Sequence, residues 1–257
     1  MTRKIIALLL ISFFFSCAKK AEESEEIVLE TKMDTANSVT GIQDLEEENL
    51  TYSIAVEEID SAAFIKAKNS APKQKSIEKN TDFKTAKKLL AGIVEFEPVD
   101  GSERYQEVKK VYFRNGKKLE NRNDFDGETF VAYFPSEDIL LCEGGHTSDM
   151  SFNLKNGKRT EETGNPDVIS ASPKNNFRLN GYFGGQQCFS YFIQKNVNGE
   201  FQNILQVDEE FKKITGHWLC IIGDAFWVDE KTLYVSETSN FDENAKPMKL
   251  YFKISLR

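Results

Sequence analysis

Hydrophobic and polar residues alternate along much of the chain after residue 93, as they do in strands with one buried face. The clearest run is 248–256, where every even-numbered residue is apolar and the odd-numbered ones are Lys, Tyr, Lys and Ser. Three Asn-Gly pairs, at Asn115, Asn156 and Asn198, lie between such runs. Asn-Gly favours tight hairpin turns, because both residues tolerate a positive φ. The pattern therefore predicts a mainly β body built from antiparallel hairpins.

Strand pairs recur in three segments, Ile139–Gly157, Ser172–Gly199 and Phe226–Ile254, and parts of them resemble the openings of β-propeller blades. A closed propeller needs about 4–8 blades of four strands each. The segments are irregularly spaced, and the body has room for fewer blades than most closed rings contain. We therefore expect an antiparallel β-sandwich or a strongly curved open sheet with propeller-blade-like hairpins.

Helical signals precede the β-rich part. Thr81 to Leu90 combines helix-forming residues with a start at Thr81 and a stop at Gly92, which predicts a short helix. Ser61 precedes a second run of good helix formers that ends near Pro72, and this run favours a weak helical stretch.

Charge is unevenly distributed along the 257 residues. Residues 18–60 contain 13 acidic and 3 basic residues, whereas residues 61–257 contain 28 of each. Between residues 18 and 81 the only aromatic residues are Tyr52 and Phe64. High charge with few aromatics predicts disorder, so we expect a largely disordered acidic tether over 18–80 and a globular domain over 81–257. A neutral body lacks the positive field that phosphate backbones require, so nucleic acid is not an expected partner.

The N-terminus has the features of an export signal. Arg3 and Lys4 precede an apolar run from Ile5 to Phe15, which is too short for a spanning helix of about 20 residues. A signal-peptide core of about 7–15 residues fits its length, and a small residue stands before Cys17. An ordinary secretory signal and a buried N-terminal helix are the alternatives.

Residues 1–17 resemble a bacterial lipoprotein signal of the Bacteroidota type, although Phe14 stands where Leu is commonest. The resemblance implies cleavage before Cys17 and acyl chains, palmitate among them, on that cysteine. It also implies that the protein is attached through this lipid to a membrane of the bacterial cell envelope. The residue after the cysteine is not Asp, and in this the chain resembles lipoproteins of the outer membrane. The resemblance therefore implies a position on the periplasmic face of that membrane or at the cell surface.

Three further cysteines, Cys142, Cys188 and Cys220, each lie in a strand-like apolar run. Free cysteines pack as small apolar residues, whereas an exported protein can also form one disulfide and leave one thiol over. Both interpretations stay open. No Cys-x-x-Cys motif or paired His spacing is present, so neither a metal site nor a cofactor is predicted.

The chain contains two histidines. His146 follows two glycines and is expected in a loop, and His217 is expected to be structural or on the surface. A catalytic triad is therefore not expected, and no catalytic residue is predicted. Carboxylates are plentiful, so a pair of the kind used by glycosidases stays open.

Five aromatic residues are candidates for lining a binding groove, although their strand-like spacing also fits packing in the core: Tyr182, Tyr191, Trp218, Trp227 and Tyr234. The favoured function is an envelope-anchored lipoprotein with a non-catalytic domain that binds a protein, peptide or glycan, or has a structural role. The alternative is an envelope hydrolase that acts on glycans or peptidoglycan through a carboxylate pair.

Overall fold

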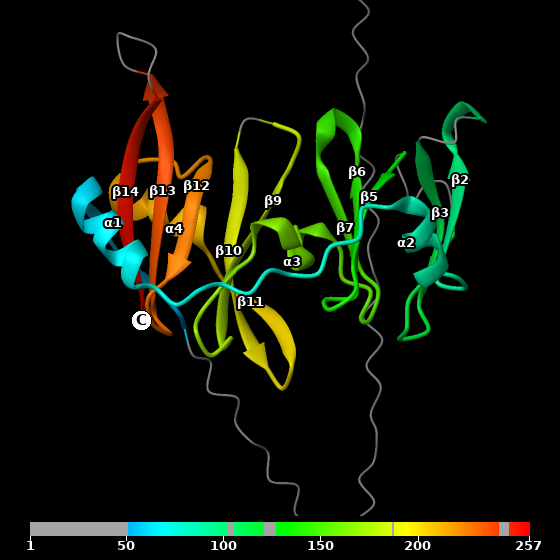
Figure 1. Ribbon diagram of the computed structural model, residues 1–257, viewed down its shortest axis with the longest axis horizontal. Coiled ribbons are helices and arrows are strands. Elements are labelled where there is room, and N and C mark those ends of the chain that lie inside the picture. Colours follow the sequence, from blue (N-terminus) through cyan, green and yellow to red (C-terminus); the bar gives the residue numbers. More distant parts are fainter. Residues whose placement is uncertain (1–50, 102–104, 121–126, 187, 242–246) are drawn as a thin grey trace, which may run out of the picture. The chain divides into compact units, whose positions relative to one another are not determined.

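The computed structural model describes residues 51–257 except 102–104, 121–126, 187 and 242–246 (Figure 1). Its strands form three antiparallel sheets, which confirms the predicted mainly β class. The signal at 1–17, the acylated Cys17 and the first part of the predicted tether lie outside the described residues. None of the described helices is long and apolar enough to cross a membrane.

One sheet, here the β2–β7 sheet, has the order β2-β3-β5-β6-β7, with β4 paired to β3. The helix α2 (Phe83–Leu89) packs its Ala86 into the core of this sheet. Asp82 caps α2 by accepting a hydrogen bond from the Thr85 amide at 2.9 Å, so the predicted short helix is confirmed. The strands are β2 (Val94–Pro98), β3 (Gln106–Tyr112), β4 (Lys118–Leu119), β5 (Thr129–Phe134), β6 (Ile139–Glu143) and β7 (Asp149–Asn153).

The middle sheet has the order β11-β10-β9-β8. Asn198 and Gly199 join β10 to β11 with φ values of 53° and 90°, as a tight hairpin turn requires. At Asn115 and Asn156 only the following glycine has a positive φ, and each Asn side chain instead accepts a hydrogen bond from the amide two residues on. The strands are β8 (Ser170–Ala171), β9 (Phe177–Phe183), β10 (Phe189–Val197) and β11 (Glu200–Gln206).

The third sheet, here the β1–β14 sheet, has the order β1-β14-β13-β12 and joins the two ends of the body. In β14 the residues Phe252, Ile254 and Leu256 are buried, which confirms the predicted alternation. Ile54 of β1 pairs with Leu256 of β14, so a strand from the start of the body completes the last sheet. The strands are β1 (Ile54–Ile59), β12 (Ile222–Trp227), β13 (Thr232–Phe241) and β14 (Pro247–Leu256).

The remaining helical segments are short. The helix α4 (Val207–Thr215) follows β11 and packs Val207 and Phe211 into the core shared by the middle sheet and the β1–β14 sheet. The others are α1 (Ser61–Ser70), α3 (Thr160–Thr163), and the 3₁₀ helices η1 (Val99–Gly101), η3 (Gly145–Thr147) and η4 (Pro166–Val168).

The body begins earlier than the predicted boundary at residue 81. Phe64 of α1 is buried, and its ring lies 5.1 Å from that of Phe226 and 4.8 Å from that of Tyr251. Asp60 caps α1 by accepting a hydrogen bond from the Ala63 amide at 2.7 Å. The prediction of a tether up to residue 80 was therefore wrong for residues 54–80. The average composition of the segment did not reveal β1 and α1, each of which buries an apolar residue against the β1–β14 sheet.

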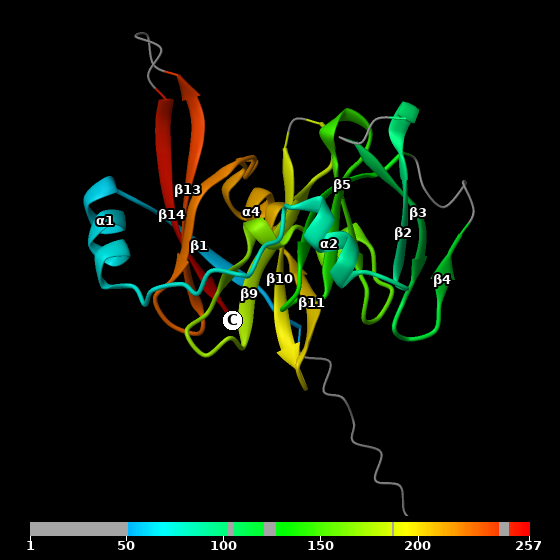
Figure 2. The same ribbon diagram turned by 45° about the vertical axis from the view of Figure 1, so that its right-hand side comes forward.

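An extended segment, residues 71–82, leads from α1 to α2, and we call it the strap (Figure 2). The side chain of Gln74 makes two hydrogen bonds with the backbone of Ala171 in β8, at 2.8 and 2.9 Å. Farther along, Asn80 exchanges two backbone hydrogen bonds with Tyr133 in β5. The strap is therefore attached first to the middle sheet and then to the β2–β7 sheet.

Candidate functional site

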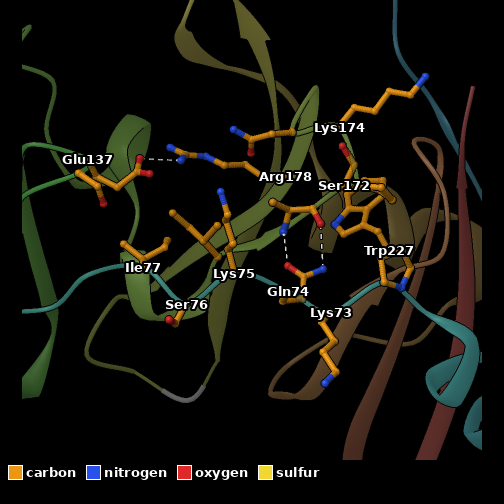
Figure 3. A pocket seen from close by; sticks show the side chains of 16 residues that line it. Lys73, Gln74, Lys75, Ser76, Ile77, Glu137, Ser172, Lys174, Arg178 and Trp227 are labelled. Atoms are coloured by element: carbon orange, nitrogen blue, oxygen red, sulfur yellow. Dashed lines mark hydrogen bonds and ion pairs between the residues drawn. The ribbon is translucent and has the colours of Figure 1, made fainter.

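A cavity of about 540 Å³ lies between the strap, the turn from β5 to β6 and the β8–β9 hairpin (Figure 3). We call it the strap cavity. A second hollow of about 300 Å³ shares Ser136, Glu137, Asn175 and Arg178 with it. Ligand pockets commonly measure about 300–1,000 Å³, so the strap cavity is large enough for a small ligand or for part of a larger one.

Arg178 of β9 lines both hollows and is only 5% exposed. Its Nε donates to Gln194 Oε1 at 2.7 Å, and its Nη1 donates to Glu137 Oε2 at 2.7 Å. The ring of Phe201 lies 3.6 Å from the guanidinium carbon. Burial lowers the pKa of Arg178, and the neighbouring Glu137 opposes that shift. The guanidinium is therefore charged and held on three sides.

Gln194 of β10 is the centre of the polar network that holds Arg178. Its carbonyl oxygen also accepts a hydrogen bond from Asn180 at 3.2 Å. Its amide donates to Asn203 Oδ1 at 2.8 Å and to the backbone oxygen of Glu162 at 3.0 Å. Because every polar atom of this buried amide has a partner, the network restrains the position of the arginine.

Part of the guanidinium faces the cavity. An arginine carries five N–H groups, and in the described part of the chain only the two hydrogen bonds above engage those of Arg178. Among the described residues, the buried polar side-chain atoms that lack a partner are Ser151 Oγ and Thr163 Oγ1. The Nη2 atom of Arg178 is not among these atoms, so its donors reach solvent in the cavity.

Positive charge exceeds negative charge on the wall of the strap cavity. The cationic lining residues are Lys73 and Lys75 of the strap, Lys174 of the β8–β9 turn and Arg178, whereas Glu137 is the only carboxylate among the lining residues. The three lysines have no ion-pair partner in the described part of the chain. Lys75 extends toward Arg178, whereas Lys73 and Lys174 extend outward (Figure 3).

Two of the five predicted groove aromatics are core residues. Tyr191 is 2% exposed, and its hydroxyl accepts a hydrogen bond from the Ile222 amide at 2.9 Å. Burial raises the pKa of Tyr191 to about 12. Trp227 is 1% exposed and donates from Nε1 to the backbone oxygen of Ser170 at 2.8 Å, although part of its side chain also lines the strap cavity.

The other three aromatics lie elsewhere. Tyr234 is stacked on Phe226, with ring centroids 5.4 Å apart. Trp218 is 48% exposed, and Lys212 Nζ lies 4.2 Å from the centre of its ring. Tyr182 is half-buried in β9. The structure therefore does not bring the five aromatics together in one groove. Strand pairing places four of them on two different sheets, Trp218 lies in a loop, and of the five only Trp227 reaches the cavity.

The histidines lie where the sequence placed them. His146 is exposed in η3, with a positive φ of 56°. His217 Nε2 lies 2.6 Å from Oε2 of the buried Glu237, whose Oε1 accepts a hydrogen bond from the Cys220 amide at 2.6 Å. His217 is thus a structural residue in a loop.

Of the two interpretations of the cysteines, the structure supports the disulfide. Cys188 and Cys220 are bonded, and they join the segments that precede β10 and β12. Cys142 is a buried free thiol, and burial raises its pKa well above the usual range. A thiol in that environment is a poor nucleophile.

Within the described ranges, no group of three or more His, Cys, Asp or Glu side chains is placed to hold a metal ion. The prediction from the sequence also missed Arg178, although one signal was present. An arginine between Phe177 and Leu179, in an apolar strand, has to find a partner when it is buried. No family model, no curated protein and no solved structure matches the chain.

Proposed function

We propose that the protein is a non-catalytic binding protein of the bacterial cell envelope, anchored through acylated Cys17, which holds its ligand in the strap cavity. The observation that carries the proposal is the buried guanidinium of Arg178, which is fixed by Glu137 and Gln194 and still presents donors to the cavity. A preorganised polar group in a concave site binds a ligand without the cost of ordering a mobile side chain.

The location in the envelope rests on separate features. Residues 1–17 have the layout of a lipoprotein signal, and an acidic segment follows Cys17. The Cys188–Cys220 disulfide fits an exported protein, since disulfides persist in oxidising compartments. In such a compartment, peptides and glycans of the envelope are the available ligands.

Binding fits the cavity better than hydrolysis does. Glycosidases need two carboxyl groups, one that donates a proton and one that acts as a base or nucleophile. Glu137 is the only carboxylate among the residues that line the strap cavity, and it forms an ion pair with Arg178 at 2.7 Å. Glu230 lies behind the wall, where its carboxylate accepts hydrogen bonds from Ser172 Oγ at 3.0 Å and from the Lys174 amide at 2.6 Å. Neither is therefore available as a member of a free acid–base pair.

A variant that fills the cavity tests the binding role. Ser136 is exposed and lines both hollows, so Ser136→Trp should obstruct them without disturbing the core. The intact protein in detergent is titrated with envelope peptides and oligosaccharides by calorimetry. We expect one of these ligands to bind and to be recovered chemically unchanged after its release. Ser136→Trp should weaken its binding roughly tenfold or more. Ser70→Trp, at the exposed end of α1, is the matched control.

Two results would contradict the binding role: turnover of a bound ligand, or binding that Ser136→Trp leaves unchanged. The envelope location has its own test. Cys17→Ser should release the protein into a soluble fraction or leave an uncleaved precursor, because the acylated residue is missing. Mass spectrometry of the mature N-terminus should find acylated Cys17, and an unmodified residue other than Cys17 there would overturn the location.

A further inference from the structure

We infer that the ligand of the strap cavity carries a carboxylate, that Arg178 and Lys75 bind it, and that Glu137 competes with it for the same guanidinium. The inference rests on the proposed function and adds the chemical class of the ligand. A carboxylate of this kind occurs on acidic amino acids and on sugar acids, and the two sources share the chemistry that the cavity recognises.

The first step is the charge of the wall. Lys73, Lys75 and Lys174 have no ion-pair partner in the described part of the chain, and Glu137 is the only lining carboxylate. Exposed lysines alone are commonly just solvated. Here Lys75 extends toward a guanidinium that is nine-tenths buried, so two like charges face one hollow (Figure 3). Glu137 pairs with the guanidinium at 2.7 Å, but Lys75 has no such partner in the described part of the chain. An anion in the hollow is attracted by Lys75 and by the remaining donors of Arg178, whereas a neutral hydroxyl gains no such charge attraction.

The second step is the geometry of the free donors. Gln194 occupies Nε of Arg178, and Glu137 occupies one N–H of Nη1. The second N–H of Nη1 and both of Nη2 have no partner among the described residues. A planar guanidinium donates two parallel hydrogen bonds to a carboxylate from adjacent nitrogens, and such charge-assisted bonds are shorter and stronger than neutral ones.

The third step separates ligand binding from a purely structural role. Arg178 lies in the middle sheet and Glu137 in the β5–β6 turn of the β2–β7 sheet, so their ion pair also ties these two parts together. The side chain of Glu137 is 23% exposed and therefore partly faces water. If the pair were only structural, neutralising Glu137 would lower stability and leave binding unchanged. If Glu137 shares the guanidinium with a ligand, the neutral variant should bind a carboxylate more tightly.

The experiment compares acids with matched neutral ligands on the intact protein in detergent, by calorimetry. One arm uses a short peptide with a C-terminal glutamate and its fully amidated form. The other arm uses trigalacturonate and its methyl ester. We expect one of the two acids to bind roughly tenfold or more tightly than its neutral form. Added salt should weaken that binding, because the lysine contribution is exposed and screened.

The variants assign the contacts. Glu137→Gln should tighten binding of the acid severalfold, and Lys75→Gln should weaken it severalfold. Lys66→Gln, on the exposed surface of α1, should change nothing. Arg178→Lys should weaken binding by roughly tenfold or more, because a lysine cannot donate the paired bonds. Circular dichroism of each variant shows whether it is folded, and Glu137→Gln keeps the test valid if Arg178→Lys does not fold.

Several outcomes would overturn the carboxylate assignment: equal binding of acid and neutral forms, weaker binding in Glu137→Gln, or no binding of either acid. The two proposals fail in different ways. If a neutral ligand binds and Ser136→Trp abolishes that binding, the cavity is a binding site and only the carboxylate assignment is wrong. If an acid binds but Ser136→Trp has no effect, the proposed function itself is wrong.

Discussion

The two faces of the middle sheet are both buried, yet they differ in the kinds of residue that they bury. One face contributes Phe177, Leu179, Tyr191 and Ile193 to the core shared with the β1–β14 sheet. The other face carries Arg178, Asn180 and Gln194, which are 5%, 0% and 1% exposed, together with the buried Phe192, which pairs with Asn180. We call them the apolar face and the polar face.

Under the proposed function, the two faces have different roles. An apolar face gains stability from burial alone. A polar face of the same size gains little net stability, because its groups exchange water for protein partners at nearly equal free energy. The polar face therefore does little for stability that apolar residues would not do better, and under the proposed function its role is to hold one guanidinium beside the cavity. Stability and binding should accordingly respond to changes on different faces.

The largest loss of stability should follow removal of the covalent link beside the apolar face. Cys188 and Cys220 are 32 residues apart in the sequence. Closing a loop of that length lowers the entropy of the unfolded chain and stabilises the fold by about 4 kcal/mol. The Cys188→Ala, Cys220→Ala double variant should lose about that much free energy of unfolding in urea. A reducing agent should destabilise the natural protein by a similar amount and leave the double variant unchanged.

Leu179→Ala should come next, because Leu179 is fully buried on the apolar face. Truncating a buried leucine costs about 2–5 kcal/mol through lost burial and the cavity that remains. Urea unfolding followed by tryptophan fluorescence measures the loss, and the folded variant should still bind ligand. Leu89→Ala, at a position that is 51% exposed, is the control and should cost little. Equal losses at the two positions would show that the apolar face is not the main source of stability.

Gln194→Leu moves the test to the polar face. Leucine fills the space but leaves the Nε of Arg178 and one N–H of the buried Asn180 amide without their partner. Unpaired buried groups cost about 1–3 kcal/mol, so we expect a loss of about 2 kcal/mol. Binding should fall more sharply than stability, because the guanidinium is no longer held. Gln202→Leu, on an exposed position of β11, is the matched control. If Gln194→Leu raised stability and kept binding, the polar face would have no role in the site.

The strands and turns could largely be predicted from the sequence, whereas the contacts of the polar face could not. Alternation in 248–256 identified β14, and Asn198-Gly199 identified the β10–β11 turn, because both signals are local. Glu137 lies 41 residues from Arg178, in the turn between two strands of another sheet, so no local pattern predicts their contact. Sequence periodicity gives the register within a hairpin, but it does not say which sheets face one another.

The same limit explains two other differences. The strand β1 pairs with β14 at the far end of the chain, so an acidic stretch with few aromatics looked like part of a tether. The candidate aromatics were chosen by residue type, and type does not distinguish a core position such as Trp227 from an exposed one such as Trp218. An arginine within an apolar strand, such as Arg178, is a more informative signal than aromatic residue type, because a buried arginine must be paired.

The smallest effect on stability should come from the ring that supports the guanidinium. Phe201 is half-buried in β11, with its ring 3.6 Å from the guanidinium carbon of Arg178. Phe201→Leu keeps an apolar side chain there but removes the negative face of the ring, and a cation–π contact of this kind contributes about 1 kcal/mol. Phe201→Tyr keeps the face and should restore both stability and binding. Since the arginine would lose one of its three supports, binding of the carboxylate should weaken severalfold while the free energy of unfolding falls only slightly. A loss as large as that of Leu179→Ala, with unchanged binding, would mean that Phe201 acts as a core residue and that the two faces do not divide stability from binding.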